Sequence, residues 1–316
     1  MKAVQFNKYG SSDRLQYVDI AKPIPNDDQV LVKIHAVSLN PLDWHIMRGS
    51  PLPVRMGNGF MKPKTPIILG ADIAGRVEAI GTSVTEFKVG DEVFGGSGLN
   101  GFAEYLVIKE NGLTHKPTNI TFQEASSIPT VAFTALQALR AGNLQAGQKF
   151  LVNGASGGVG TIAIQIAKAM GAEVTGVCSA KNIDLVCSLG ANHVIDYTKQ
   201  DYTKTGQQYD MILDTINNLS ISARRRVLKP NGICVVVGFG SLMKMITVAL
   251  VGKRGDKKVS FILANRAKAD LLIIKEMLEA GTVKPVIDRY YSFNQIPEAI
   301  RYLETGRARG KIIINI

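Results

Sequence analysis

The chain has 316 residues, which corresponds to about two domains of ordinary size. Hydrophobic residues make up 46% and charged residues 20% of the sequence, a composition typical of a folded globular protein and not of a disordered or fibrous one. The net charge of +11 suits an anionic partner without identifying one. The 3 cysteines are too few for a disulfide framework and match no zinc spacing, so we expect a reducing, cytoplasmic location.

The sequence contains no segment that we expect to be exported or to span a membrane. Residues Met1–Tyr9 lack the apolar region of a signal peptide. The longest apolar stretch, Ile233–Val251, is interrupted by Lys244, and its beginning is typical of a buried strand that enters a loop.

The first part of the chain predicts a β-rich domain. Apolar and polar residues alternate over Gln29–Val37, as in a half-buried strand. Pro and Gly recur from residue 41 to residue 66, so we expect a loop there. Further short strands are predicted at Gly75–Ile80, Asp91–Phe94 and Phe102–Val107. Many short strands joined by turns favour a barrel-like domain.

From about residue 123 the pattern changes to strands that alternate with helices. Strands are predicted at Lys149–Asn153, Glu173–Cys178, His193–Tyr197, Met211–Asp214 and Ile233–Val237. Helices are predicted at Gly158–Met170, Asn182–Leu189, Lys268–Ala280 and Gln295–Thr305, followed by a last strand at Lys311–Ile316. Apolar strands separated by helices indicate an α/β domain with a doubly wound parallel sheet.

A glycine-rich turn, Asn153–Gly160 (NGASGGVG), lies between a predicted strand and a predicted helix. Ala155, Gly157 and Gly160 take the three places of the GxGxxG pattern of dinucleotide-binding folds. Small residues there permit a tight turn, close approach to a pyrophosphate and close packing of the helix. We therefore expect these residues to bind a dinucleotide: Ala155, Ser156, Gly157, Gly158, Val159 and Gly160.

The end of the second strand of this domain indicates which dinucleotide binds. Sites for NAD usually place a carboxylate about 20 residues beyond the turn. This chain has Ser179 there, followed by Lys181, which suit a 2′-phosphate. Tyr197, after the third strand, has a hydroxyl that can join them. The sequence therefore predicts NADPH as the cofactor.

Motifs along the whole chain resemble those of the medium-chain dehydrogenase/reductase superfamily, in its zinc-free quinone oxidoreductase branch. They are Ser38–Gly49, Gly70–Gly81, Val89–Phe94, Ile128–Leu139, the glycine-rich turn and Gly306–Ile314. The resemblance implies a GroES-like β-rich catalytic domain of residues 1–122 and 266–316. It also implies a Rossmann NADPH-binding domain of residues 123–265.

The places of the catalytic zinc ligands in this superfamily fall on Asn40, Ala71 and Thr130. Zinc requires at least three side-chain donors, and alanine offers none. We therefore expect no metal. Hydride transfer to an already electrophilic acceptor, a quinone or an α,β-unsaturated carbonyl, is the chemistry that this leaves.

The resemblance also implies the residues of the site. Asn40, Asp43 and Thr130 are the catalytic candidates, although Asp43 also suits the role of a carboxylate that caps a turn. Asp72 replaces a family glutamate, and we expect it to pair with an Arg or Lys side chain. The further candidates for cofactor binding are Thr134, Gly238, Phe239, Phe261, Leu263, Arg309 and Lys311.

Basic residues gather in residues 241–272 and in Arg224–Arg226. Residues 241–272 contain a single aromatic residue, Phe261, which gives base stacking little support, and we favour neither nucleic acid nor a membrane surface as the partner of these basic residues. A homodimer through the strand at Val259–Leu263 is expected by analogy with the family. The alternatives to a quinone or enone reductase are a 2-enoyl thioester reductase and a dinucleotide-binding regulatory or RNA-binding protein.

Overall fold

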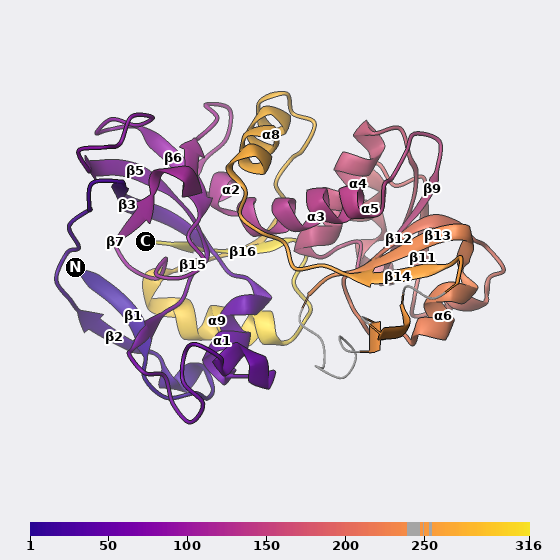
Figure 1. Cartoon of the computed structure of the whole chain (residues 1–316), viewed down its shortest axis with the longest axis horizontal. Coiled ribbons are helices and arrows are strands. Elements are labelled where there is room, and N and C mark those ends of the chain that lie inside the picture. The colour runs from indigo at the N-terminus through magenta and orange to yellow at the C-terminus, as the bar shows by residue number, and fades with distance from the viewer. Residues whose placement is uncertain (239–246, 249, 253–254) are drawn as a thin grey trace. The chain divides into compact units, whose positions relative to one another are not determined.

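The computed structural model describes residues 1–238, 247–248, 250–252 and 255–316. They form two compact units, and each is described by itself (Figure 1). Unit 1 contains Met1–Thr130, Arg266–Ala280 and Pro285–Ile316. Unit 2 contains Val131–Asn265 and Gly281–Lys284. Both ends of the chain lie in unit 1.

Unit 1 is built around a curved, mainly antiparallel sheet of seven strands. The strand order is β15 (Ile287–Ser292), β16 (Lys311–Asn315), β3 (Gln29–Ser38), β5 (Asp72–Ile80), β6 (Glu92–Gly96) and β8 (Leu113–His115), and β7 (Tyr105–Lys109) also pairs with β3. A smaller sheet has the order β2 (Gln16–Asp19), β1 (Lys2–Phe6) and β4 (Ile67–Ile68). Both the N-terminal part of the chain and its C-terminal part, with β15 and β16, thus contribute strands to this sheet.

Short helices cover the sheets of unit 1. They are α1 (Pro41–Arg48), α2 (Phe122–Ser126), α8 (Lys268–Glu279) and α9 (Ile296–Glu304), with the 3-10 turns η1 (Ser12–Arg14), η2 (Leu52–Arg55), η3 (Glu110–Gly112) and η6 (Phe293–Gln295). Helix α2 packs on β3 and β5, and the ring of Phe122 stacks on that of His35 at 4.5 Å. Residues 123–130 therefore lie in unit 1, whereas the sequence placed them in the dinucleotide-binding domain.

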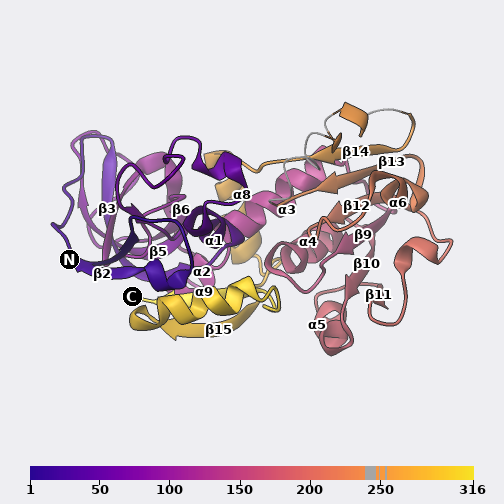
Figure 2. The same cartoon turned by 90° about the horizontal axis from the view of Figure 1, so that it is seen from below.

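Unit 2 has a parallel sheet with the strand order β11 (His193–Asp196), β10 (Glu173–Cys178), β9 (Lys149–Asn153), β12 (Tyr209–Asp214), β13 (Leu228–Val236) and β14 (Lys258–Phe261). Figure 2 shows the strands in this order, with β14 at the top. The helices and turns include α3 (Pro129–Ala141), α4 (Gly158–Ala169), α5 (Ile183–Ser188), α6 (Ile221–Arg226), η4 (Ala180–Asn182) and η5 (Tyr202–Lys204). Helices α4 and α6 lie on opposite faces of the sheet, so the expected doubly wound fold is confirmed.

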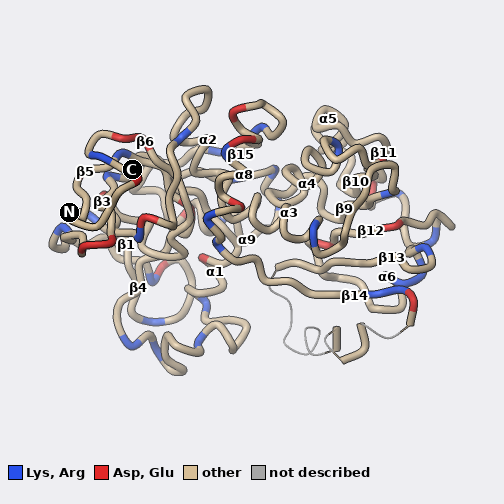
Figure 3. The backbone as a smooth tube through the Cα atoms, turned by 45° about the horizontal axis from the view of Figure 1, so that its top comes forward, with Lys and Arg blue, Asp and Glu red and all other residues tan. Residues whose placement is uncertain are grey.

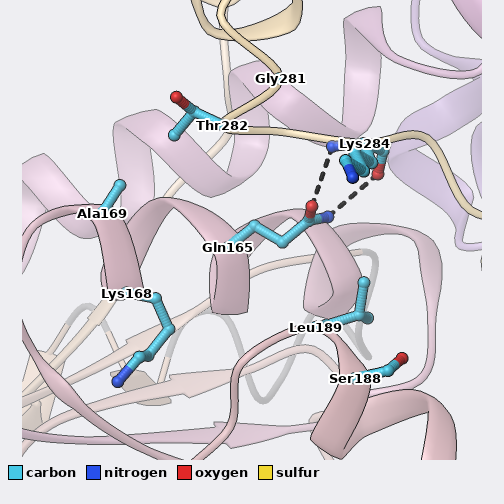
Figure 4. Close-up of a pocket in the computed structure, with 8 residues that line it drawn as sticks. All are labelled: Gln165, Lys168, Ala169, Ser188, Leu189, Gly281, Thr282 and Lys284. Carbon is cyan, nitrogen blue, oxygen red and sulfur yellow. Dashed lines mark hydrogen bonds between the residues drawn. The ribbon is translucent and has the colours of Figure 1, made fainter.

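Residues 281–284 belong to unit 2 because Gln165 of α4 holds them (Figure 4). The Gln165 side chain donates to the Lys284 carbonyl at 3.0 Å and accepts from its N–H at 2.8 Å. A shallow pocket of about 430 Å³ lies beside this contact. Its lining contains two lysines and no carboxylate, and it lies at the end of α4 remote from the glycine-rich turn.

The structure corrects one expectation about secondary structure. Residues Pro41–Arg48 form α1, not a loop. Pro41 takes the first helical position, where a missing N–H costs nothing, and Asn40 and Asp43 form a capping box around it. Among the described residues, no helix is both long and apolar enough to cross a bilayer.

Candidate active site

Unit 1 holds a buried polar cluster where three of its strands meet. Asp72 begins β5 and lies opposite Ser38, the last residue of β3. Lys311 begins β16, which pairs with the same end of β3. Asn40 precedes α1, and Thr130 lies in the first turn of α3. The sheet register thus brings together residues that are far apart in the sequence, and we call Asn40, Asp43, Asp72, Thr130 and Lys311 the Lys311 cluster.

Lys311 is the cation of this cluster. Its Nζ donates to the Leu39 carbonyl at 2.8 Å and to Asn40 Oδ1 at 2.6 Å. The same Nζ lies 3.7 Å from Asp72 Oδ2, so the predicted pairing of Asp72 with a basic side chain is confirmed. Burial lowers the pKa of Lys311, and the carboxyl groups of Asp72 and Asp43 oppose this effect. The sequence placed Lys311 at the cofactor, but its ammonium group is engaged inside unit 1.

The amide of Asn40 is fully used within the cluster. Its Oδ1 accepts from Lys311, and its Nδ2 donates to Asp72 Oδ2 at 2.9 Å and to the Ser38 carbonyl at 3.4 Å. The side chain is 1% exposed. Asn40 was expected to offer its amide to a substrate or to the nicotinamide. In the structure Asn40 contacts Asp72 and Lys311, and its role toward the substrate or the nicotinamide stays a prediction.

Thr130 is the half-buried member of an otherwise buried cluster. Its Oγ1 donates to Asp72 Oδ1 at 2.7 Å, and its backbone N–H donates to the same oxygen at 3.1 Å. Since the hydroxyl proton is directed at Asp72, the remaining lone pairs of Oγ1 can only accept. Thr130 thus ties the first turn of α3 to Asp72.

Asp43 lies at the start of α1 and is 0% exposed. Its Oδ2 accepts from the Asn40 N–H at 2.7 Å, and its Oδ1 accepts from the Gly70 N–H at 2.9 Å. Burial raises the pKa of Asp43 to about 6, although both N–H groups favour the ionised form. These contacts match the capping role, and they tie α1 to the segment before β5.

The arrangement does not fit a zinc ion. Of the three places expected for ligands, Ala71 has no donor atom, and the oxygen of Asn40 faces the ammonium group of Lys311. In the part of the chain that the structure describes, no group of three or more His, Cys, Asp or Glu side chains suits a metal ion.

The glycine-rich turn of unit 2 joins β9 to α4. Gly154 has φ +90°, and Gly157 is the N-cap of α4, where no side chain caps the helix. A Cβ atom on Gly160 would overlap the carbonyl oxygen of Gly154 and the backbone of Ala155. The first turn of α4 thus packs closely on β9 and leaves its N–H groups available to a phosphate. This cradle fits the pyrophosphate of a dinucleotide.

A second polar group lies beside the turn. Asn182 Nδ2 donates to Ser156 Oγ at 2.9 Å and to Ser179 Oγ at 3.4 Å. Asn182 is 6% exposed, and its Oδ1 is a buried acceptor without a partner among the described residues. An acceptor in this place can receive a hydrogen bond from a ribose hydroxyl of the dinucleotide. Sequence reasoning did not single out Asn182, although its position in the turn directly after β10 was a signal.

The side chains expected around a 2′-phosphate lie at the ends of β10 and β11. Lys181 is exposed, and Tyr197 is 61% exposed. A nearby carboxylate, Asp196, pairs in register with Cys178 and accepts from both the N–H and the hydroxyl of Thr198. Those contacts hold Asp196 in its own turn, and the Thr198 hydroxyl is the main reason why its pKa is lowered.

The remaining candidates for cofactor binding are scattered over the two units. Thr134 is a half-buried residue of α3, and Gly238 has φ +90°. Phe261 ends β14 and packs on the core of unit 2, whereas Leu263 is 63% exposed. Arg309 is exposed in unit 1, and its N–H donates to Asp288. Phe239 lies outside the described residues.

Sequence reasoning missed a buried ion pair in unit 2. Arg224 and Asp214 are 2% and 0% exposed, and their side chains meet at 2.8 Å. Asn153, at the end of β9, donates to Asp214 Oδ1 at 2.9 Å. Arg225 donates to backbone carbonyls, among them that of Lys257 at 3.0 Å. The run Arg224–Arg226 is therefore largely structural and is not a basic surface.

Known protein families match the sequence of both units. Residues 26–118 match the family model described as alcohol dehydrogenase GroES-like domain, and residues 189–314 match the one described as zinc-binding dehydrogenase. The mitochondrial NAD(P)H oxidoreductase RTN4IP1 of Danio rerio is 34% identical over 100% of this chain and 91% of its own length. The chloroplastic quinone-oxidoreductase QR1 of Triphysaria versicolor is 35% identical over 99% of this chain and 98% of its own length.

A solved structure shows the same fold over the whole chain. The quinone oxidoreductase from Coxiella burnetii has a TM-score of 0.91 and 29% identity, with 100% of this chain and 99% of that chain covered. Together with the two relatives, this structural similarity establishes the family that the sequence motifs implied. The chain belongs to the medium-chain dehydrogenase/reductase superfamily, in its quinone oxidoreductase branch.

Proposed function

We propose that the chain is an NADPH-dependent reductase of quinones or α,β-unsaturated carbonyls and that it works without zinc. The observation that carries this proposal is the Lys311 cluster. An ammonium group contacts Asn40 at the place of the metal ligands, and nothing there can polarise an alcohol as a metal ion does. Hydride transfer to an acceptor that is already electrophilic needs no such help.

The reduced nicotinamide, when bound, supplies the hydride. The residues of the chain bind and orient it. The first turn of α4 holds the pyrophosphate, and Asn182 accepts from a ribose hydroxyl. Thr130 donates to Asp72 and ties the start of α3 to the Lys311 cluster. Since the protons of Asn40 and Thr130 are committed to Asp72 and Ser38, neither side chain protonates the product, and solvent delivers that proton.

The direct test is NADPH oxidation, followed by absorbance, with a 1,4-quinone, an alkenal and an enoyl thioester as acceptors. We expect turnover with the quinone or the alkenal that a metal chelator leaves unchanged. Preference for the enoyl thioester would indicate the alternative function, a 2-enoyl thioester reductase. Tight NADPH binding without turnover on any acceptor would favour a regulatory protein instead.

The choice of NADPH over NADH is tested separately by binding. Lys181 is exposed at the end of β10, where a 2′-phosphate would lie. We expect Lys181→Ala to weaken NADPH binding about fivefold to tenfold and to leave NADH binding unchanged. Lys8→Ala, at an exposed lysine of unit 1, is the matched control. Equal affinity of the native chain for the two cofactors would contradict the assignment.

We also propose a cytoplasmic homodimer. The three cysteines are all unpaired, which suits a reducing compartment. Strand β14 is the last strand of its sheet, and on its outer edge the Val259 N–H donates to the Gly252 carbonyl at 2.8 Å, so a second copy would pair with β14 beyond Val259. Fractionation of cells that produce the chain tests the location, and light scattering tests the mass.

A further inference from the structure

The strand order of unit 2 reverses between β9 and β12. The chain runs from β9 through β10 to β11 on one side of the sheet and then returns to β12 on the other side of β9. Dinucleotides bind outside the carboxyl ends of the strands at such a reversal. The glycine-rich turn follows β9 there, and residues 215–217, which we call the 215–217 turn, follow β12. We therefore expect the 215–217 turn to form a second wall of the dinucleotide site.

The 215–217 turn lies directly against the glycine-rich turn. The backbone N–H and the hydroxyl of Thr215 both donate to the Asn153 carbonyl, at 3.1 Å and 2.9 Å. A Cβ atom on Gly154 would overlap the Thr215 hydroxyl and would lie 2.9 Å from Cδ1 of Ile216. Ile216 is nevertheless 53% exposed. A shift of the 215–217 turn would therefore change the surface beside the glycine-rich turn.

The carboxylate of Asp214 ties the 215–217 turn to the end of β12. Asp214 is the last residue of β12 and pairs in register with Asn153, the last residue of β9. Its Oδ1 accepts from the N–H of Ile216 at 3.1 Å and from the N–H of Asn217 at 3.0 Å. The same oxygen accepts from the Asn153 side chain. One buried carboxylate thus contacts both turns.

The guanidinium of Arg224 holds the other side of this arrangement. Arg224 is the buried one of three successive arginines of α6, which Figure 3 marks in blue. Its Nε donates to Asp214 Oδ2 at 2.9 Å, and its Nη2 donates to Asn217 Oδ1 at 2.8 Å. Asn217 has φ +55°, a left-handed conformation that is uncommon for residues other than glycine. Arg224 therefore holds the turn through Asp214 and through the side chain of Asn217.

We propose that Arg224 is a positioning residue of the dinucleotide site. A buried ion pair is a costly way to stabilise a core, and apolar residues often serve as well or better. The planar guanidinium, however, fixes two acceptors in one geometry, which an ammonium group does not do. Arg224 keeps the 215–217 turn in place before the cofactor arrives, so binding costs less ordering. This inference rests on the proposed binding of NADPH and is independent of the acceptor.

Fluorescence titration with NADPH tests the proposal on the full chain, and urea denaturation of the same variants reports stability. Arg224→Lys keeps the positive charge but cannot bond Asp214 and Asn217 in the fork geometry. We expect it to raise the Kd for NADPH about tenfold. In turnover, the KM for NADPH should rise while kcat stays within about twofold of the native value. A purely structural role would lower stability and leave the Kd of the folded chain unchanged.

A second variant removes the contact without disturbing the buried charges. Asn217→Gly adopts the left-handed conformation freely and loses only the side chain that Arg224 holds. We expect its Kd for NADPH to rise about threefold to fivefold, with little change in the urea midpoint. This variant decides the question if Arg224→Lys fails to fold.

The matched control is Arg225→Lys, at the next residue of α6. Arg225 donates to the carbonyls of Lys257 and Val251, away from the 215–217 turn. Its substitution should leave the Kd for NADPH unchanged. The proposal is overturned if Arg225→Lys and Arg224→Lys raise the Kd equally, or if neither Arg224→Lys nor Asn217→Gly raises it. A native chain that binds NADH and not NADPH would contradict the proposed cofactor alone, and the same ratios measured with NADH would then decide the role of Arg224. A native chain that binds neither dinucleotide would overturn both proposals.

Discussion

Lys311 links the residues of the buried cluster in unit 1. It neutralises Asp72, fixes the orientation of the Asn40 amide and satisfies the Leu39 carbonyl. A buried ion pair contributes modestly when intact, but the loss of one partner leaves an uncompensated charge. The contacts of Asn40 and Thr130 both depend on Asp72, so one substitution disturbs the whole group.

Lys311→Met should lower the free energy of unfolding by about 3–5 kcal/mol because it leaves the Asp72 carboxylate buried without a counter-charge. Urea denaturation measures the loss. Lys22→Met, which breaks an exposed pair with Glu78, is the control and should cost far less. Addition of Asp72→Asn to Lys311→Met should restore part of the stability. A loss no greater than that of the control would show that the cluster does not depend on this charge.

The raised pKa of Asp43 has a consequence for the pH dependence of stability. The pKa of Asp43 is about 6 in the folded chain, so the folded chain holds this proton at a pH where the unfolded chain, with the ordinary aspartate pKa of 3.8, has released it. The contribution of Asp43 to the free energy of unfolding therefore falls as pH rises between these values, by roughly 3 kcal/mol in all, and is constant above them.

Asp43→Asn is neutral at every pH and should lack this contribution. Urea denaturation of the native chain and the variant, at about pH 4 and about pH 7, measures the difference. The native chain should lose stability relative to the variant as pH rises across this range. A constant difference between the two would show that Asp43 is ionised in the folded chain throughout.

At the scale of elements, the secondary-structure predictions were correct where a single hydrophobic pattern or a single motif determines the element. Strands β9 and β10 begin and end at the predicted residues, because each is a short apolar run between turns. Helix α1 was missed because Pro41 was taken as a breaker, whereas in the first turn it supports a helix. The glycine-rich turn was placed correctly between β9 and α4.

The site was less predictable than the fold. The pairing of Asp72 with a basic residue was expected, but the identity of the partner depends on β16 joining β3, which local sequence does not encode. For the same reason Lys311 was assigned to the cofactor. Asn182 and the Asp214–Arg224 pair were missed because their contacts arise only when neighbouring strands end at one edge of the sheet.

Two glycines of the turn, the N-cap Gly157 and the helical Gly160, test its packing. A Cβ at Gly160 would overlap the Gly154 carbonyl, whereas one at Gly157 would lie 3.5 Å from it, an ordinary contact. Gly160→Ala should therefore lower the thermal midpoint by several degrees and weaken NADPH binding. Gly157→Ala should leave the midpoint nearly unchanged and weaken NADPH binding alone, since its methyl group would face the pyrophosphate. Equal midpoints of the two variants would contradict the close packing.

At the scale of the whole molecule, each unit has its own core and its own part of the chemistry. The core of unit 1 and the core of unit 2 share no residue. Unit 1 supplies the Lys311 cluster, and unit 2 supplies the cradle for the dinucleotide. Strand β14 belongs to unit 2, so assembly of two copies through its outer edge would join their dinucleotide-binding units.

Light scattering should give twice the monomer mass of 34.1 kDa. Leu263 follows β14 and is 63% exposed, so Leu263→Asp should shift the mass towards the monomer. Leu272→Asp, on α8 and 42% exposed, should leave the mass unchanged. A monomer for the native chain would remove the proposed dimer but would leave the assignment of the cofactor untouched.

The sheet of unit 1 is completed by β16, which the ribosome makes after the whole of unit 2. Until then β3 lacks its neighbour on that side, and Asp72 lacks its counter-charge. Unit 2, whose strands are nearly contiguous in sequence, can fold first during synthesis. The nascent chain therefore acquires its dinucleotide fold before its catalytic half is closed, and an arrested chain that ends before residue 311 should expose an unfinished sheet to chaperones and proteases.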